Sequence, residues 1–107
     1  MELLGLFSVY RQECPDIVHH VAIKPIFMGG DHSISLPLLR AAKEKYGPLA
    51  LIHFDAHSDL WHGYFENKDT HGTPFRRALE EGLINPACSS QIGLRGPLYN
   101  KDDFKMS

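Results

Sequence analysis

Short apolar segments alternate with helix-like segments along this chain, and that alternation restricts the folds open to it. Three segments have the character of strands: "PIFM" at 25–28, "LALIHF" at 49–54 and "SQIGLR" at 90–95. Strands separated by helical segments are typical of βαβ units, in which right-handed crossovers join neighbouring parallel strands. The sequence therefore predicts an α/β fold built on a mainly parallel sheet.

Helix signals occupy the segments between the strands. We expect helices at residues 14–24, 33–46 and 74–81. The last is the best defined, because Thr73 can cap its start, Pro74 suits its first position and Gly82 suits the position after its end. Its charged side chains should form a solvated face with i,i+4 pairs: Arg76, Arg77, Glu80 and Glu81.

Charge and composition exclude several classes of protein. The formal net charge of −2 gives no reason to expect nucleic acid or an anionic membrane as a partner. Cys14 and Cys88 lie too far apart for a redox or paired-ligand motif, which favours a reducing compartment. No apolar stretch approaches the roughly 18 residues that a membrane span needs, and no secretory signal is evident. The sequence therefore predicts a cytoplasmic protein without a membrane segment.

Two polar clusters follow strand-like segments: "GDHS" at 30–33 and "DAHSD" at 55–59. The carboxyl ends of parallel strands meet at one edge of a sheet, where ligands gather. If the chain stays extended past residue 54, period-two geometry places Asp55, His57 and Asp59 on one side. His32 can join them from a neighbouring strand. Carboxylate and imidazole ligands suit Mn²⁺, Fe²⁺ or Zn²⁺, and the lack of a nearby thiol argues against structural zinc.

Plainer structural roles are the alternatives for these residues. A polar D-x-H-x-D segment after a strand can be a solvated turn, and Asp31 or Ser33 can simply cap the following helix. His53, inside the strand-like segment, is expected to be a packed or hydrogen-bonded histidine.

Three motifs, "GGDHS", "DAHSD" and "HGTPFRRALEEGL", resemble in their order and separation the ureohydrolase family, which contains the arginases and agmatinases. The resemblance covers residues 25–99, and "HGTPFRR" is similar to the agmatinase-like branch. It implies a three-layer α/β/α fold of the arginase type and a binuclear manganese centre. Residues 1–107 would then be part of one ureohydrolase domain.

The resemblance also assigns roles to individual residues. His32, Asp55, His57 and Asp59 match four of the family's metal ligands. Asp55 would bridge two Mn²⁺ ions, His57 would bind one, and His32 with Asp59 the other. His71 matches a histidine near the family's substrate pocket, where it would shuttle protons or orient the substrate.

Hydrolysis of a small linear guanidino compound, such as agmatine, to urea and an amine is the activity that the resemblance implies. A manganese-activated hydroxide would attack the guanidinium carbon. Family members of this kind form homo-oligomers, and a complete form could also be mitochondrial. Trp61, Tyr64 and Phe65 could line the substrate pocket or pack inside the protein.

One family motif has no match in these 107 residues. Family members carry two further metal-binding aspartates in a later S-x-D-x-D-x-x-D-P segment, and this sequence contains no such segment. We therefore expect a partial domain that is inactive by itself. The alternative is a non-catalytic truncated product that binds one metal ion weakly or associates with full-length subunits.

Overall fold

The computed structural model describes residues 25–98, so the helix expected at 14–24 lies outside the described residues. In chain order the described elements, with η for a 3₁₀-helix, are η1 (His32–Ile34), α2 (Ser35–Tyr46), β1 (Ile52–Phe54), α3 (Pro74–Glu80), η2 (Pro86–Cys88) and β2 (Ser90–Ile92). None of the helices in this part of the chain has the length and apolar character to cross a membrane. Strands and helices alternate after residue 48, as the sequence predicts.

Strands β1 and β2 pair in parallel, which confirms the predicted βαβ pairing. His53 lies beside Gln91 in the register, with α3 in the connection between the two strands. Outside the named strands, Leu49 forms a parallel bridge with Ile84. The pairing therefore runs alongside the whole "LALIHF" segment, although only its last three residues form a regular strand.

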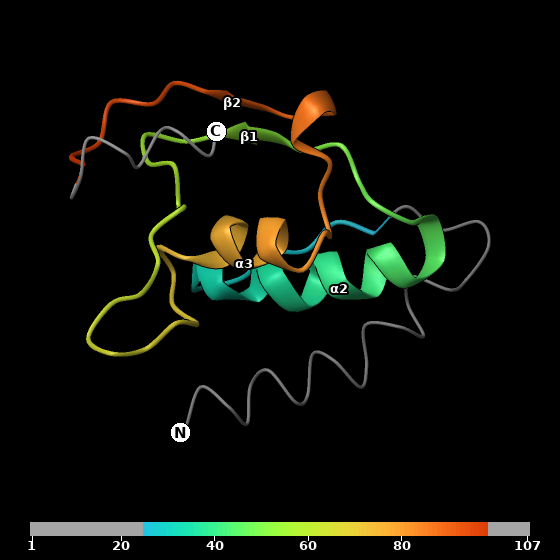
Figure 1. The fold of residues 1–107 in the computed structure, drawn as a ribbon, viewed down its shortest axis with the longest axis horizontal. Helices are drawn as coiled ribbons and strands as arrows, with labels where there is room; N and C mark the ends of the chain where they lie inside the picture. Colours follow the sequence, from blue (N-terminus) through green and yellow to red (C-terminus); the bar gives the residue numbers. More distant parts are fainter. Residues whose placement is uncertain (1–24, 99–107) are drawn as a thin grey trace.

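Helices α2 and α3 pack side by side against one face of this sheet (Figure 1). The buried centre consists of Leu36, Ala78, Leu83 and Ile84, with Leu39, Leu51 and Leu79 packed around it. The helix predicted at 33–46 forms with a 3₁₀ first turn and ends before Gly47, whose φ of 75° is left-handed. Asp31 caps that first turn, because its Oδ1 accepts a hydrogen bond from the Ser33 N–H at 2.8 Å.

The opposite face of the two strands is exposed. Ile52, Phe54 and Ile92 retain 67%, 74% and 47% of their accessible surface. Only His53 of β1 is buried, because it points to the helix side. Of the three layers that the family resemblance implies, the described residues contain two, the sheet and one helical layer.

The strand expected at 25–28 does not form. Residues 25–29 have no regular secondary structure, and Ile26 and Met28 are more than nine-tenths exposed. A strand needs a neighbour to take up its backbone hydrogen bonds, and no strand lies beside this segment among the described residues. The apolar composition of this segment is therefore not enough to predict a strand.

Helix α3 follows its predicted signals, with one correction to its charged face. It starts at Pro74 and ends before Gly82, which has a φ of 62°. Arg76 pairs with Glu80 at i,i+4, as expected. Arg77, however, is buried, because its guanidinium reaches back to the carbonyl oxygen of His62 at 3.1 Å. That contact ties the long loop before α3 to the helix.

Thr73 occupies the N-cap position of α3, but its side chain does not cap the helix. Its Oγ1 accepts a hydrogen bond from the Thr70 N–H at 2.9 Å and donates one to the Lys68 carbonyl oxygen at 2.7 Å. Thr73 is completely buried. Its hydroxyl therefore closes the turn at 68–73, which carries His71.

We predict that Thr73→Val lowers the free energy of unfolding by about 1–3 kcal/mol, because it leaves the part-buried Thr70 N–H without its acceptor. Thr70→Val is the matched control, since the Thr70 hydroxyl is buried and has no hydrogen-bond partner among the described residues. It should leave the stability unchanged or slightly raised. Urea denaturation of both variants measures the difference, and equal losses would contradict this role of Thr73.

Candidate metal centre

Four side chains gather at the edge of the sheet where β1 ends. His32, His53, Asp55 and Asp59 each offer one ligand atom, and these atoms all lie within 4.8 Å of one another. His53 and Asp59 are buried, whereas His32 and Asp55 are half-buried. Three of the four are predicted ligands, and the fourth, His53, was expected only to be packed or hydrogen-bonded. Imidazole nitrogens and carboxylate oxygens together form a donor set suited to a divalent transition metal.

A turn, and not an extended strand, brings Asp55 and Asp59 together. Oδ1 of Asp55 accepts a hydrogen bond from the His57 N–H at 2.8 Å, which bends the chain directly after β1. Asp59 has a left-handed φ of 54°, a conformation that aspartate tolerates better than most residues. The predicted alternation of three side chains on one face is therefore wrong, although two of the three carboxylate and imidazole groups still converge. Backbone strain of this kind is common at functional sites.

Asp55 stays ionised at neutral pH. The His57 N–H that donates to its carboxylate lowers the pKa of Asp55, and this effect exceeds the opposing effect of burial. Nearby histidines lower it further. A carboxylate is therefore available at the end of β1.

His32 reaches the cluster from the turn that begins α2. Its Nδ1 lies 2.9 Å from Oδ2 of Asp59, and this short contact raises the pKa of His32 against the effect of burial. The His32 ring also packs edge-on against Phe75 of α3, with ring centroids 5.4 Å apart. The prediction that His32 lies near the D-x-H-x-D segment is confirmed, although no strand at 25–28 carries it there.

His53 lies beneath the carboxylates, on the helix side of β1. Its Nε2 lies 3.6 Å from Oδ2 of Asp55 and 3.8 Å from Oδ2 of Asp59. Burial lowers the pKa of His53, so this ring favours the neutral form. Phe75 packs against the ring, with centroids 4.4 Å apart. The alternation of "LIHF" could have indicated that a buried histidine precedes Asp55 by two residues.

The residues present fit a bound cation. Oδ2 of Asp59 is a buried atom that no aligned hydrogen bond reaches from the described residues, despite the short contact to His32. A buried carboxylate needs a positive charge nearby, and in the metal-free state the His32 ring is the group closest to Oδ2. A cation coordinated by Asp59 would take over that role. His32 and Asp55 offer further ligand atoms to the same cation.

His57, a predicted ligand, lies outside this group. It is exposed, and its Nδ1 is 3.4 Å from Oδ1 of Asp55. Gly96 passes so close that a Cβ there would lie 2.3 Å from Cδ2 of the ring. The backbone after β2 thus holds His57 at the rim of the site, beside Asp55 but apart from the other ligand atoms.

His71 lies in a neighbouring hollow and not in the metal-binding group. The hollow has a volume of about 290 Å³ and is lined by Asp31, Tyr64, Phe65, Asn67, Thr70 and His71. Tyr64 meets the His71 ring edge-on and stacks on Trp61. Phe65 is 87% exposed. Tyr64 and Phe65 therefore line the same hollow as Asp31, the residue before His32. Trp61 stacks on Tyr64 and is not among the residues that line the hollow.

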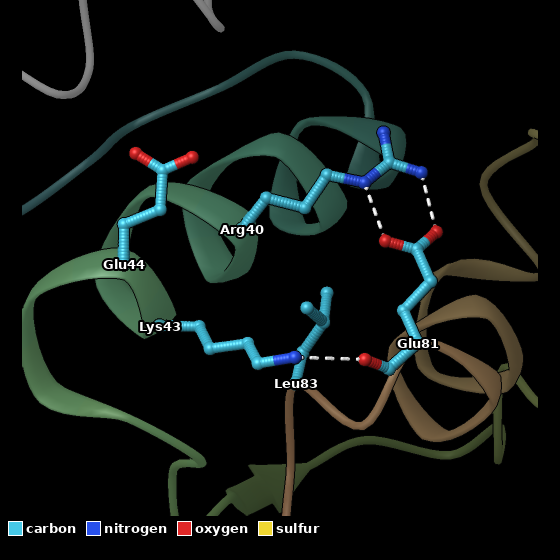
Figure 2. Close-up of a pocket in the computed structure, with 5 residues that line it drawn as sticks. All are labelled: Arg40, Lys43, Glu44, Glu81 and Leu83. Atoms are coloured by element: carbon cyan, nitrogen blue, oxygen red, sulfur yellow. Dashed lines mark hydrogen bonds and ion pairs between the residues drawn. The ribbon is translucent and has the colours of Figure 1, made fainter.

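A second, larger hollow of about 550 Å³ is lined by none of these residues. Figure 2 shows its walls, formed by Arg40, Lys43, Glu44, Glu81 and Leu83. Nε and Nη2 of Arg40 each donate a hydrogen bond to one oxygen of the Glu81 carboxylate. Lys43 Nζ donates to the Glu81 carbonyl oxygen at 2.9 Å. These contacts join the second half of α2 to the residue that follows α3. Three of the four charged side chains of this hollow, Arg40, Lys43 and Glu81, therefore hold the two helices together.

Comparisons with known proteins agree on one family. The arginase family model matches residues 8–107. The chain is 50% identical over 95 residues to guanidinopropionase from Pseudomonas aeruginosa, covering 88% of this chain and 28% of that protein. It is 46% identical over 105 residues to guanidinobutyrase from the same organism, covering 98% of this chain and 33% of that protein.

Solved structures agree with this similarity. Proclavaminate amidino hydrolase from Streptomyces clavuligerus superimposes with a TM-score of 0.82 at 35% identity, over 97% of this chain and 35% of that one. Arginase from Medicago truncatula gives a TM-score of 0.85 at 33% identity, over 99% and 33%. The arginase-like α/β fold predicted from the motifs is thereby confirmed. The chain spans about a third or less of the length of these relatives.

We predict opposite pKa shifts for the two clustered histidines in the metal-free protein. The pKa of His32 should lie above 6.5, because Asp59 stabilises its charged form, and that of His53 below 6.5, because burial favours its neutral form. A metal must displace the proton from His32, so its affinity should fall as the pH drops through the raised pKa. NMR titration of the ring protons measures both values.

The variant Asp59→Asn tests the cause of the His32 shift. It should bring the pKa of His32 down towards 6.5, because it removes the carboxylate charge next to the ring. Equal pKa values for His32 and His53 in the unmodified protein would contradict the geometry described above.

Proposed function

This chain belongs to the arginase family, and from that premise we propose that the full-length protein hydrolyses a small linear guanidino compound to urea and an amine. The observation that carries the proposal is the convergence of His32, Asp55 and Asp59 within one group of ligand atoms. These residues come from two separate motifs, and both motifs belong to the family resemblance.

Mn²⁺ is the cation that we propose for this centre. Carboxylate oxygens with imidazole nitrogen, and no thiolate, suit it well. His32, Asp55 and Asp59 would hold it, and His57, next to Asp55 at the rim, would serve a second ion. Bound divalent cations supply hydroxide near neutral pH, because they lower the pKa of a coordinated water molecule.

The chain's own residues prepare this site for a positively charged substrate. Asp55, ionised through the His57 N–H, and Asp59 bring negative charge to a half-buried edge of the sheet. That charge offsets the repulsion between metal ions and a guanidinium group. His71 lies exposed in the adjoining hollow, where we assign it to orienting the substrate or transferring a proton.

The substrate class follows from what the relatives' names share. Guanidinopropionase, guanidinobutyrase and agmatinases are among the similar proteins, and proclavaminate amidinohydrolase is another. The shared feature is a guanidino-type group at the end of a chain, whereas the far ends of these molecules differ. We therefore assign the guanidino end to this site and leave the other end of the substrate to be identified by assay.

We place the protein in the cytoplasm as a homo-oligomer. An agmatinase among its relatives, from Gallus gallus, is mitochondrial by name.

We predict that Asp55→Ala in the full-length protein removes both activity and bound manganese, because it deletes a carboxylate that contacts His57 and lies in the ligand group. His71→Ala should reduce turnover while leaving the manganese content unchanged, because His71 lies in the neighbouring hollow. Mass spectrometry of bound metal and a urea assay separate these effects.

The exposed loop residue His62 offers a matched control. His62→Ala should leave both turnover and metal content unchanged. Two metal ions retained in the Asp55→Ala protein would overturn the ligand assignment, and loss of metal in His71→Ala would show that His71 is misplaced.

We also predict that the 107 residues by themselves release no urea from agmatine, even with added manganese. Two ions cannot be held close together without further carboxylates between them. The exposed apolar side chains Ile26, Met28 and Phe54 should in addition favour aggregation. A urea assay with light scattering tests this, and a soluble monomer with manganese-dependent activity would refute it.

A further inference from the structure

The orientation of the Gln91 amide is fixed by its neighbours. Nε2 of Gln91 lies 2.7 Å from the carbonyl oxygen of Ser58, which can only accept a hydrogen bond. The same Nε2 lies 3.1 Å from Nδ1 of His53. The amide group facing both atoms must therefore be the –NH₂ group, which has one hydrogen for each.

This orientation determines the tautomer of His53. A nitrogen that accepts a hydrogen bond from Gln91 cannot carry a proton itself, so the proton of the neutral ring is on Nε2. Nε2 points towards the carboxylates, 3.6 Å from Asp55 and 3.8 Å from Asp59. It is buried, and no other group among the described residues accepts its proton.

We propose that His53 is a positioning residue, which donates its Nε2–H to the Asp55 and Asp59 carboxylates and so holds them in place as metal ligands. Since Nδ1 accepts a hydrogen bond from Gln91, Nε2 of His53 could coordinate a metal only if the ring became an imidazolate, and burial disfavours that anion. We therefore leave His53 out of the ligand set despite its place in the group of four. The inference rests on the proposed function, because it takes Asp55 and Asp59 as ligands. A movement of under about 1 Å brings Nε2 within hydrogen-bond distance of either carboxylate.

The surroundings make this support rigid. Phe75 packs against the His53 ring, and Gln91 is held by its register with His53 across the two strands. The bond from Gln91 to the Ser58 carbonyl also fixes the backbone directly before Asp59. One amide thus orients both the histidine and the turn that carries the ligand. Partners of this kind change metal affinity by about 10- to 100-fold when they are removed.

The test compares two substitutions in the full-length protein. His53→Phe keeps an aromatic ring against Phe75 but removes the donor, and it should weaken Mn²⁺ binding by about 10- to 100-fold in calorimetric titration. His53→Gln places an amide donor near the position of Nε2, and it should restore the affinity to within about threefold of the unmodified protein. His62→Phe controls for the exchange of histidine for phenylalanine and should bind Mn²⁺ normally.

A second measurement needs no substitution. Neutron diffraction from crystals of the full-length protein should show deuterium on Nε2 of His53 and none on Nδ1. Deuterium on Nδ1, or equal Mn²⁺ affinity in the unmodified and His53→Phe proteins, would overturn the inference and leave the proposed hydrolysis standing. A protein that binds Mn²⁺ with the expected His53 dependence but releases no urea from guanidino compounds would refute only the proposed function.

Discussion

The parallel pairing of β1 with β2 is the interaction on which the site depends. The ladder does not stop at the end of the strands, because the Asp55 N–H donates to the Ile92 carbonyl oxygen at 3.1 Å. The Arg95 and Gly96 N–H groups then donate to the carbonyl oxygen of Ala56 at 2.8 and 2.7 Å. The turn after β1 is therefore held by backbone bonds from the chain that follows β2.

Electrostatics gives that turn its chemical character. Two carboxylates and two imidazoles lie within 4.8 Å at a partly buried edge, where charges are screened less than at the surface. The contact with Asp59 raises the pKa of His32 and favours its charged form, whereas burial lowers the pKa of His53 and favours its neutral form. Oδ2 of Asp59 is buried between them, close to the His32 ring but without an aligned hydrogen bond from the described residues. The donor set of this cluster therefore fits a cation, which gives the family resemblance a physical basis in these residues.

Some expectations from the sequence are confirmed because they depend on local interactions alone. Gly47 and Gly82 end their helices in left-handed conformations that other residues adopt at a cost, so these boundaries are visible in the sequence. The predictions of a strand at 25–28 and of a solvated Arg77 are wrong, because the environments of both depend on partners that are distant in the sequence. A strand needs a neighbouring strand, and Arg77 is buried only because the loop carbonyl of His62 lies beside it.

The sequence by itself determined the α/β alternation, the helix ends, the family and three of the four clustered side chains: His32, Asp55 and Asp59. The alternation and the helix ends follow from interactions between residues close in sequence. The family and the three side chains follow from the spacing of the motifs. Only the tertiary structure decided that the chain turns after β1, that His57 stays at the rim and that His53 lies beneath the carboxylates. Those outcomes depend on the register that places Gln91 beside His53, and a register between strands 38 residues apart cannot be read from either segment alone.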